Sequence, residues 1–232
     1  MCTAYILAHG VSRCTVFCMP YPSKTDRQTI LSAAVKELAH GGIRDLSLRN
    51  IAASLDLAPN AIYRYFSDRR ALEAALANEA ARQLELALRK AADGCEPVTA
   101  IRAMSSAYIK FARDNPHLYE VMMSLHAPEH DATSHQSLWT FTVEQVQRIA
   151  GSDRAAQASV ALWAFLHGAV ALEAAQVLGE IKPASGLEFG FEAWLMAVSM
   201  RGEPIDALRI KPTQKRANKK VSARGRSVPS GK

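Results

Sequence analysis

Residues 47–72 read SLRNIAASLDLAPNAIYRYFSDRRAL, a pattern typical of two short amphipathic helices joined by a tight turn. Ser47 is suited to cap the first helix, in which apolar residues recur at spacings of three and four. Pro59 takes the first position of the second helix, where its missing N–H costs nothing. Ile62 and Phe66 are four residues apart and therefore point to one buried face. The stretch predicts a helix-turn-helix unit.

The second helix leaves a polar and aromatic set of side chains for the solvent, namely Asn60, Ala61, Tyr63, Arg64 and Tyr65. Tyrosine, arginine and asparagine combine phosphate donors with side chains that read base edges in a major groove. Asp68 caps the next helix and places Arg69 and Arg70 beside the same surface. We therefore predict DNA binding. The alternative is a helical bundle in which these side chains form only a solvated face.

Three motifs give segment 25–75 a resemblance to TetR/AcrR-type transcriptional regulators: Ile51-Ala52, Ile62-Tyr63-Arg64-Tyr65-Phe66, and Asp68-Arg69 with Leu72. The resemblance implies a three-helix, homeodomain-like head. It also implies phosphate contacts from Ser47, Tyr63, Tyr65 and Arg69, and base contacts from Asn60, Ala61 and Arg64. Arg49, in the first of the two helices, completes the predicted DNA-binding set.

The sequence departs from the family pattern at several positions of this head. Asp56 stands where a turn glycine is usual, and Ala58 stands where a hydroxyl cap is usual. Aspartate tolerates the left-handed conformation, and the lost cap costs ~1 kcal/mol, partly offset by the following proline. Tyr65 and Arg69 replace a commoner histidine and lysine, and both keep a phosphate donor. Arg70 replaces an acidic residue and weakens the helix start.

Composition indicates an all-α protein with a real core, because 49% of the 232 residues are hydrophobic and strand-like alternation is scarce. Without the nine Lys and Arg of residues 209–232, the net charge of +6 becomes −3, so the basicity is local. Four cysteines make no disulfide framework, which fits a reducing cytoplasm. No hydrophobic run approaches the ~20 residues of a membrane span, and the N-terminus is a poor signal peptide.

We expect four parts along the chain: a disordered extension (1–22), the helix-turn-helix domain (23–70), a helical regulatory and dimerisation domain (71–201) and a basic disordered tail (202–232). Thr25 and Gln28 form a capping-box pattern for the first helix, which Gly41-Gly42 should stop. A helix from Arg69 to about Ala92 would couple the head to the rest.

The C-terminal half carries a second resemblance, over roughly residues 100–200. Trp163, His167 and Gly168, in the run LWAFLHG, resemble the Trp-His-Gly class of regulatory domains in the same family. A helix over 155–178, capped by Ser152 or Asp153, is apolar on several sides and should pack both in its own subunit and against a partner. With a last helix over 187–198, the resemblance implies a four-helix dimer bundle.

Large adaptable side chains in this half suit a ligand pocket, and we predict one lined by Tyr108, Met122, Trp139, Trp163 and His167. The alternative for each is an ordinary core position, and for His167 a core histidine bonded to a neighbour. The cluster of His126, His130 and His135, ahead of a helix over 137–150, is expected to be a hydrated loop rather than a metal site.

Together these patterns predict a dimeric, ligand-responsive regulator, most simply a repressor that binds a palindromic operator. Its partners would be double-stranded DNA, a second copy and a small-molecule effector, with no membrane, cofactor, metal or catalytic residue. Two alternatives remain. An enzyme would use His167 or the histidine cluster, although no nucleophile–base arrangement accompanies them. A DNA-compacting architectural protein would rely on the basic tail.

Overall fold

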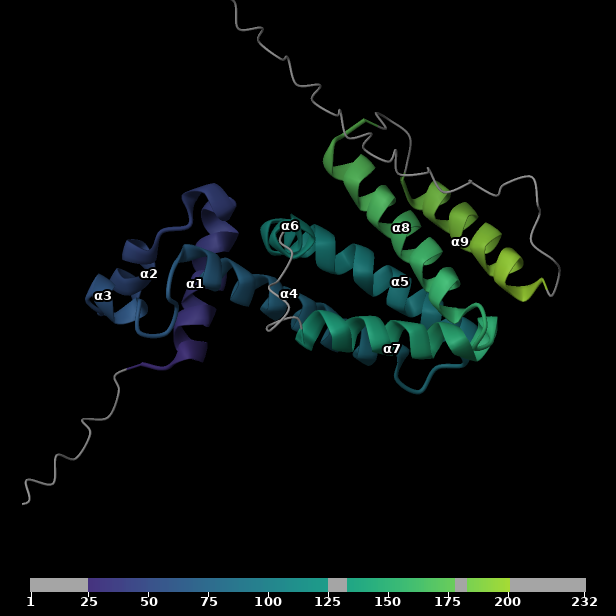
Figure 1. Ribbon diagram of the computed structural model, residues 1–232. Helices are drawn as coiled ribbons and strands as arrows, with labels where there is room; N and C mark the ends of the chain where they lie inside the picture. The colour runs from purple at the N-terminus through teal and green to yellow at the C-terminus, as the bar shows by residue number, and fades with distance from the viewer. Residues whose placement is uncertain (1–24, 125–132, 178–182, 201–232) are drawn as a thin grey trace, which may run out of the picture. The chain divides into compact units, whose positions relative to one another are not determined.

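The computed structural model describes residues 25–124, 133–177 and 183–200. These residues form nine helices and, within those ranges, no strand, which confirms the all-α prediction (Figure 1). The predicted extension and tail, together with His126 and His130, lie outside the described residues. The helices are α1 Arg27–Asp45, α2 Leu48–Ser54, α3 Pro59–Ile62, α4 Arg69–Ala92, α5 Pro97–Asp114, α6 Pro116–Ser124, α7 Thr133–Ala150, α8 Ala155–Ala174 and α9 Pro183–Ser199.

The first three helices form the predicted helix-turn-helix head. Ile62 is 0% and Phe66 1% exposed, so the two side chains share the buried face that their spacing predicts. Asp56 has φ 52, the left-handed conformation that the turn needs without a glycine. Pro59 is at the start of α3, which is only one turn long and continues as hydrogen-bonded turns through Tyr65.

The start and the end of α1 differ from the expected pattern. Its cap is Asp26, whose Oδ1 accepts the Thr29 N–H at 2.7 Å, so the capping box of Thr25 and Gln28 is wrong. Aspartate is the stronger cap, because its charge also meets the positive end of the helix dipole. Gly42 has φ 70 and breaks the regular geometry, yet the helix resumes and runs to Asp45.

Helix α4 has the predicted bounds and connects the head to the body. Asp68 caps it by accepting the Ala71 N–H at 2.8 Å, and it ends beside Gly94, which has φ 66. Along its length α4 packs against α1 in the head and against α5, α6 and α7 in the body. Its buried side includes Leu72, Leu84 and Leu88, so the helix is fixed in both regions.

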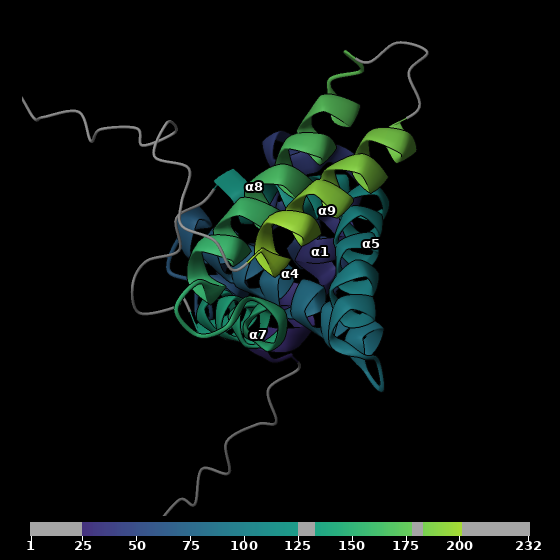
Figure 2. The same ribbon diagram turned by 90° about the vertical axis from the view of Figure 1, so that its right-hand side faces the viewer.

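Helices α8 and α9 lie side by side against the rest of the body (Figures 1 and 2). Trp194 of α9 donates its indole N–H to the Ala158 carbonyl of α8 at 3.0 Å. At Gly190 the helices come so close that an added Cβ would lie 2.2 Å from the Phe165 ring. The Arg154 guanidinium donates to the Val198 carbonyl at 2.6 Å.

Four features at helix ends in the body differ from those that the sequence predicts. Helix α7 begins at Thr133 rather than 137, so His135 belongs to a helix and not to a loop. Helix α8 has Arg154 as its N-cap and no side-chain cap bond, so neither Ser152 nor Asp153 caps it. It ends at Ala174 rather than residue 178, because Gln176 takes φ 53. Helix α9 starts earlier than 187, at Pro183.

Helix α8 has 20 residues and a mean hydropathy of 1.5, long and apolar enough to cross a membrane by length and composition. The expectation that no run approaches such a length is therefore wrong for this helix. Within the described part of the chain α8 packs against α5, α7 and α9. Only 22% of this stretch is buried, and Val160, Trp163 and Leu172 are each about half exposed, so α8 has an apolar face that the described residues do not cover.

Candidate functional sites

The predicted DNA-binding residues lie on one continuous stretch of the head, from the start of α2 to the start of α4. Arg49, Asn60, Tyr63, Arg64 and Arg69 are exposed, and Tyr63 is 52% exposed despite its apolar ring. Ser47, Ala61 and Tyr65 are half-buried. We call Ser47, Arg49, Asn60, Ala61, Tyr63 and Arg64 the recognition surface. It offers cations, amides and hydroxyls, the groups that phosphates and base edges accept from.

Ser47 caps α2 and can still donate a hydrogen bond. Its Oγ accepts the Asn50 N–H at 3.3 Å and so caps α2, as predicted. The hydroxyl keeps its own proton for a further acceptor such as a phosphate. The Asn50 side chain in turn donates to Glu37 Oε1 at 2.8 Å, which ties α2 to α1.

Tyr65 and Arg69 make bonds inside the head that the sequence did not indicate. The Tyr65 hydroxyl donates to the Thr25 carbonyl at 2.8 Å. Arg69 donates to the carbonyls of Leu46, at 3.0 Å, and Ile43, and its Nε pairs with Glu73 at 2.7 Å. These two side chains therefore brace the head. A phosphate would have to compete with a carbonyl for the Tyr65 proton, whereas Arg69 has further N–H groups to offer.

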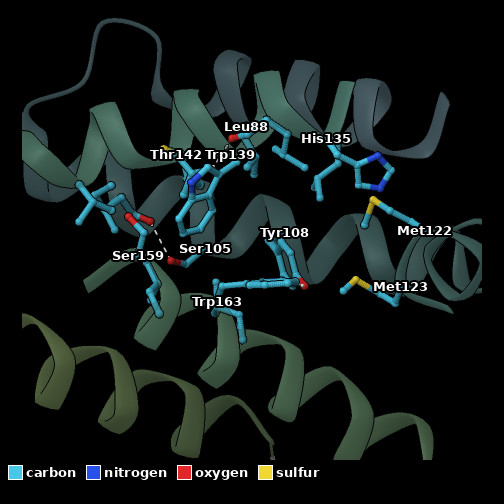
Figure 3. A pocket seen from close by; sticks show the side chains of 17 residues that line it. Leu88, Ser105, Tyr108, Met122, Met123, His135, Trp139, Thr142, Ser159 and Trp163 are labelled. Atoms are coloured by element: carbon cyan, nitrogen blue, oxygen red, sulfur yellow. Dashed lines mark hydrogen bonds between the residues drawn. The ribbon is translucent and has the colours of Figure 1, made fainter. Parts of the chain in front are cut away.

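A cavity of about 490 Å³ lies in the body between α4, α5, α6, α7 and α8 (Figure 3). Of the predicted ligand-binding residues, Tyr108, Met122, Trp139 and Trp163 line it. His167 does not. The volume lies in the range of pockets that enclose drug-sized molecules. The other lining residues are Leu84, Leu88, Ile101, Met104, Ser105, Met123, His135, Leu138, Thr142, Val146, Ser159, Leu162 and Leu166.

His167 is connected to the cavity through a chain of hydrogen bonds. Its Nδ1 is 2.7 Å from the Tyr119 hydroxyl, which is 2.7 Å from the Tyr108 hydroxyl. The Trp163 indole N–H donates to that same Tyr108 oxygen at 3.2 Å. Burial raises the pKa of the Tyr108 hydroxyl, so the phenol stays neutral. This geometry is that of a histidine bonded to a neighbour, the alternative that the sequence left open.

The cavity wall is uncharged near neutral pH. Among the described residues that line it there is no Lys, Arg, Asp or Glu. Desolvation lowers the pKa of His135, with a hydrogen bond to the Met122 backbone opposing the shift. His135 Nδ1 also donates to Asn78 Oδ1 at 3.3 Å. The polar lining residues were missed in the sequence, because only packing tells which face of a helix they take.

Elsewhere in the described ranges, no group of three His, Cys, Asp or Glu residues is arranged to hold a metal ion. His135, the described member of the predicted histidine cluster, lines the cavity instead. The candidate functional sites of the described residues are therefore the recognition surface and the cavity.

Two family models match the chain over the regions just described. Residues 30–76 match bacterial regulatory proteins of the tetR family, and residues 101–192 match the tetracyclin repressor-like C-terminal domain. The first match covers the head with the start of α4. The second covers most of the cavity wall and the run that contains Trp163 and His167. No curated protein matched the chain.

Solved structures share the fold over about three quarters of the chain. A protein of unknown function from Rhodococcus sp. RHA1 is 23% identical, with a TM-score of 0.67, over 78% of this chain and 100% of its own. A TetR regulator from Streptomyces coelicolor is 20% identical, with a TM-score of 0.62, over 75% and 98%. A TetR from Acinetobacter baumannii in complex with minocycline is 17% identical, with a TM-score of 0.55, over 75% and 96%.

Proposed function

The chain belongs to the TetR family of bacterial regulatory proteins, and from this premise we propose that it is a dimeric repressor released from a palindromic operator by a small-molecule effector. It would act in the cytoplasm, where the operator is. One observation carries the proposal: α4 joins an exposed, polar recognition surface to a body that encloses an apolar cavity.

In this proposal α3 lies in a major groove. Tyr63 contacts phosphates, while Asn60, Ala61 and Arg64 face base edges, supported by Ser47 and Arg49 from α2. Two heads on the same face of the duplex would meet half-sites ~34–36 Å apart. The exposure of Tyr63 and Arg64 supports these roles.

The proposed dimer uses the apolar side chains that α8 and α9 leave exposed. Phe189 is 78% and Met196 66% exposed on α9, and seven residues of spacing place them on one face. Val160 and Leu172 of α8 are about half exposed. Apolar groups gathered in this way mark an interface, and two copies of the α8–α9 pair would form a four-helix contact about a two-fold axis.

The proposed effector acts through α4 and α6, which line the cavity and also pack against α1 of the head. Helix α4 lines the cavity with Leu84 and Leu88. It begins at Arg69, which donates to the carbonyls of Ile43 in α1 and of Leu46 just after α1. Helix α6 lines it with Met122 and Met123, and its His117 lies against Gly42 of α1. A molecule that binds better to another arrangement of these two helices would shift the heads away from the operator spacing.

The proposal is tested by a gel-shift assay with palindromes taken from the DNA that flanks this gene. We expect binding of a dimer to one palindrome and its release by a compound that fits the cavity. An architectural protein would instead give uniform coverage in a footprint, with no preference for the palindrome. If the protein were instead an activator whose DNA binding requires the effector, the compound would promote the gel shift rather than abolish it.

A further inference from the structure

Ser159 is a buried serine of α8 that lines the cavity (Figure 3). Its side chain is 0% exposed, and its Oγ has no hydrogen-bond partner among the described residues. Buried hydroxyls are nearly always hydrogen-bonded, because leaving one unpaired is costly. A polar group in this state on a cavity wall is suited to a bound molecule.

The other helical hydroxyls of the wall behave differently. Ser105 donates its proton to the Ile101 carbonyl and Thr142 to the Leu138 carbonyl, each at 2.8 Å and each one turn back along its own helix. Their oxygens can still accept, but their protons are used. Ser159 makes no such bond, so its proton remains available to an acceptor inside the cavity.

The absence of charge on the cavity wall limits the kind of ligand that can carry this acceptor. No Lys, Arg, Asp or Glu lines the cavity, and Tyr108 and His135 are neutral there. A charged ligand would lose its hydration without gaining an opposite charge, which buried sites do not tolerate. Most of the remaining wall consists of Leu, Met, Val, Ile and aromatic side chains, which favour apolar bulk.

We propose that the effector is an uncharged, mainly apolar molecule that carries a hydroxyl, carbonyl or ether oxygen, and that this oxygen accepts a hydrogen bond from Ser159. The inference rests on the proposed function, since it names the class of molecule for the same cavity. Ser159 is a specificity-determining residue in this account, because it discriminates an oxygenated molecule from a hydrocarbon of equal size.

The test uses the full chain and three probes with one alkyl length: 1-decanol, decanoate and decylammonium, each below its aggregation concentration. Affinity is measured by titration calorimetry and by the fluorescence of Trp139 and Trp163, which line the cavity. We expect 1-decanol to bind most tightly. Ser159→Ala should weaken 1-decanol by about tenfold, because the ligand oxygen is then buried without a partner.

The matched control is Ser106→Ala, which removes a hydroxyl of α5 that is exposed, bonded to the Arg102 carbonyl at 3.1 Å and outside the cavity. It should leave affinity for 1-decanol unchanged. Ser159→Ala loses no bond within the protein, so its melting temperature should equal or exceed that of the wild type. Thermal unfolding of both variants therefore separates loss of the anchor from loss of the fold.

Three results would overturn the proposal: equal 1-decanol affinity in wild type and Ser159→Ala, tighter binding of either ionic probe, or no binding of 1-decanol up to its solubility. The same preparations are assayed for sequence-specific DNA binding. A specific DNA-binding dimer that ignores 1-decanol removes this inference alone. A protein that binds 1-decanol but no specific DNA removes the proposed function and leaves the cavity chemistry standing.

Discussion

The recognition surface and the cavity differ in how their residues are brought together. Every residue of the recognition surface lies between positions 47 and 64, on two short helices and one turn. The cavity draws its wall from Leu84 to Leu166, on five helices, and turns its apolar side chains away from solvent. Local spacing rules decide the first site, whereas long-range packing decides the second. The two sites should therefore fail separately when they are mutated.

The largest effect on operator affinity is expected from substitutions on the exposed apolar face of α9, which lies in the body and not in the DNA-binding head. Phe189→Glu combined with Met196→Glu places charges on the exposed apolar face of α9. If that face holds two subunits together, operator affinity should fall by about 100-fold or more, because each head then binds a half-site alone. Sedimentation and a gel shift measure both quantities. Leu86→Glu, at an apolar residue of α4 that is also exposed, should change neither.

A smaller loss of DNA affinity is expected from single substitutions on the recognition surface. Arg64→Ala should cost about 1–3 kcal/mol of operator affinity and relax preference at one base position, whereas Tyr63→Ala should weaken operator and random DNA equally. Competition gel shifts with both DNAs distinguish the two patterns. Neither variant should alter 1-decanol affinity, because both side chains are on the head surface. Equal loss on both DNAs from both variants would contradict the assigned roles.

Tyr63 and Tyr65 provide a matched pair within the head. Tyr65→Phe removes the bond to the Thr25 carbonyl and should lower the free energy of unfolding by about 0.5–1.5 kcal/mol. Tyr63→Phe should leave stability unchanged, because its ring is exposed, and should instead weaken DNA binding. Urea titrations and gel shifts of the two variants test this. The reverse pattern would return Tyr65 to the phosphate contact that the family resemblance implies.

The smallest effect concerns the pH dependence of the cavity wall. Because burial lowers the pKa of His135, the unfolded chain binds its proton first as the pH falls. The contribution of this group to stability is therefore lost progressively below the ordinary histidine pKa of about 6.5, by at most ~1.4 kcal/mol per pH unit. His135→Gln should flatten the stability curve between pH 7 and pH 5.5. An identical slope in the two proteins would show that His135 titrates normally.

A structural feature of the head can be predicted from the sequence when the residues that determine it are close together along the chain. Asp56, Pro59 and Asp68 could be assigned from neighbouring residues, because turns and caps are decided within four positions. The bond from Tyr65 to Thr25 spans 40 residues, and that from Arg69 to Leu46 spans 23. No local pattern predicts such partners, so the bracing role of these two side chains appears only in the fold.

The residues of the cavity are even harder to predict from local sequence than those of the head. Its aromatic and methionine residues could be proposed from size and adaptability, and Tyr108, Met122, Trp139 and Trp163 do line it. Ser159 carries no feature in the sequence that separates it from Ser106, because burial and the absence of a partner are properties of the packed helices. The loop predicted around His135 is wrong, because α7 begins at Thr133 and therefore includes His135.

The central claim is that two heads, each with α3 in a major groove, read one operator. A selection of purified protein against random oligonucleotides, followed by the mass of the complex on the selected DNA, tests it most directly. We predict a palindrome whose half-sites are centred roughly 10–10.5 base pairs apart, or a multiple of that spacing, and occupied by an even number of subunits. A selection that enriches no sequence, or a complex containing a single subunit, would contradict the account.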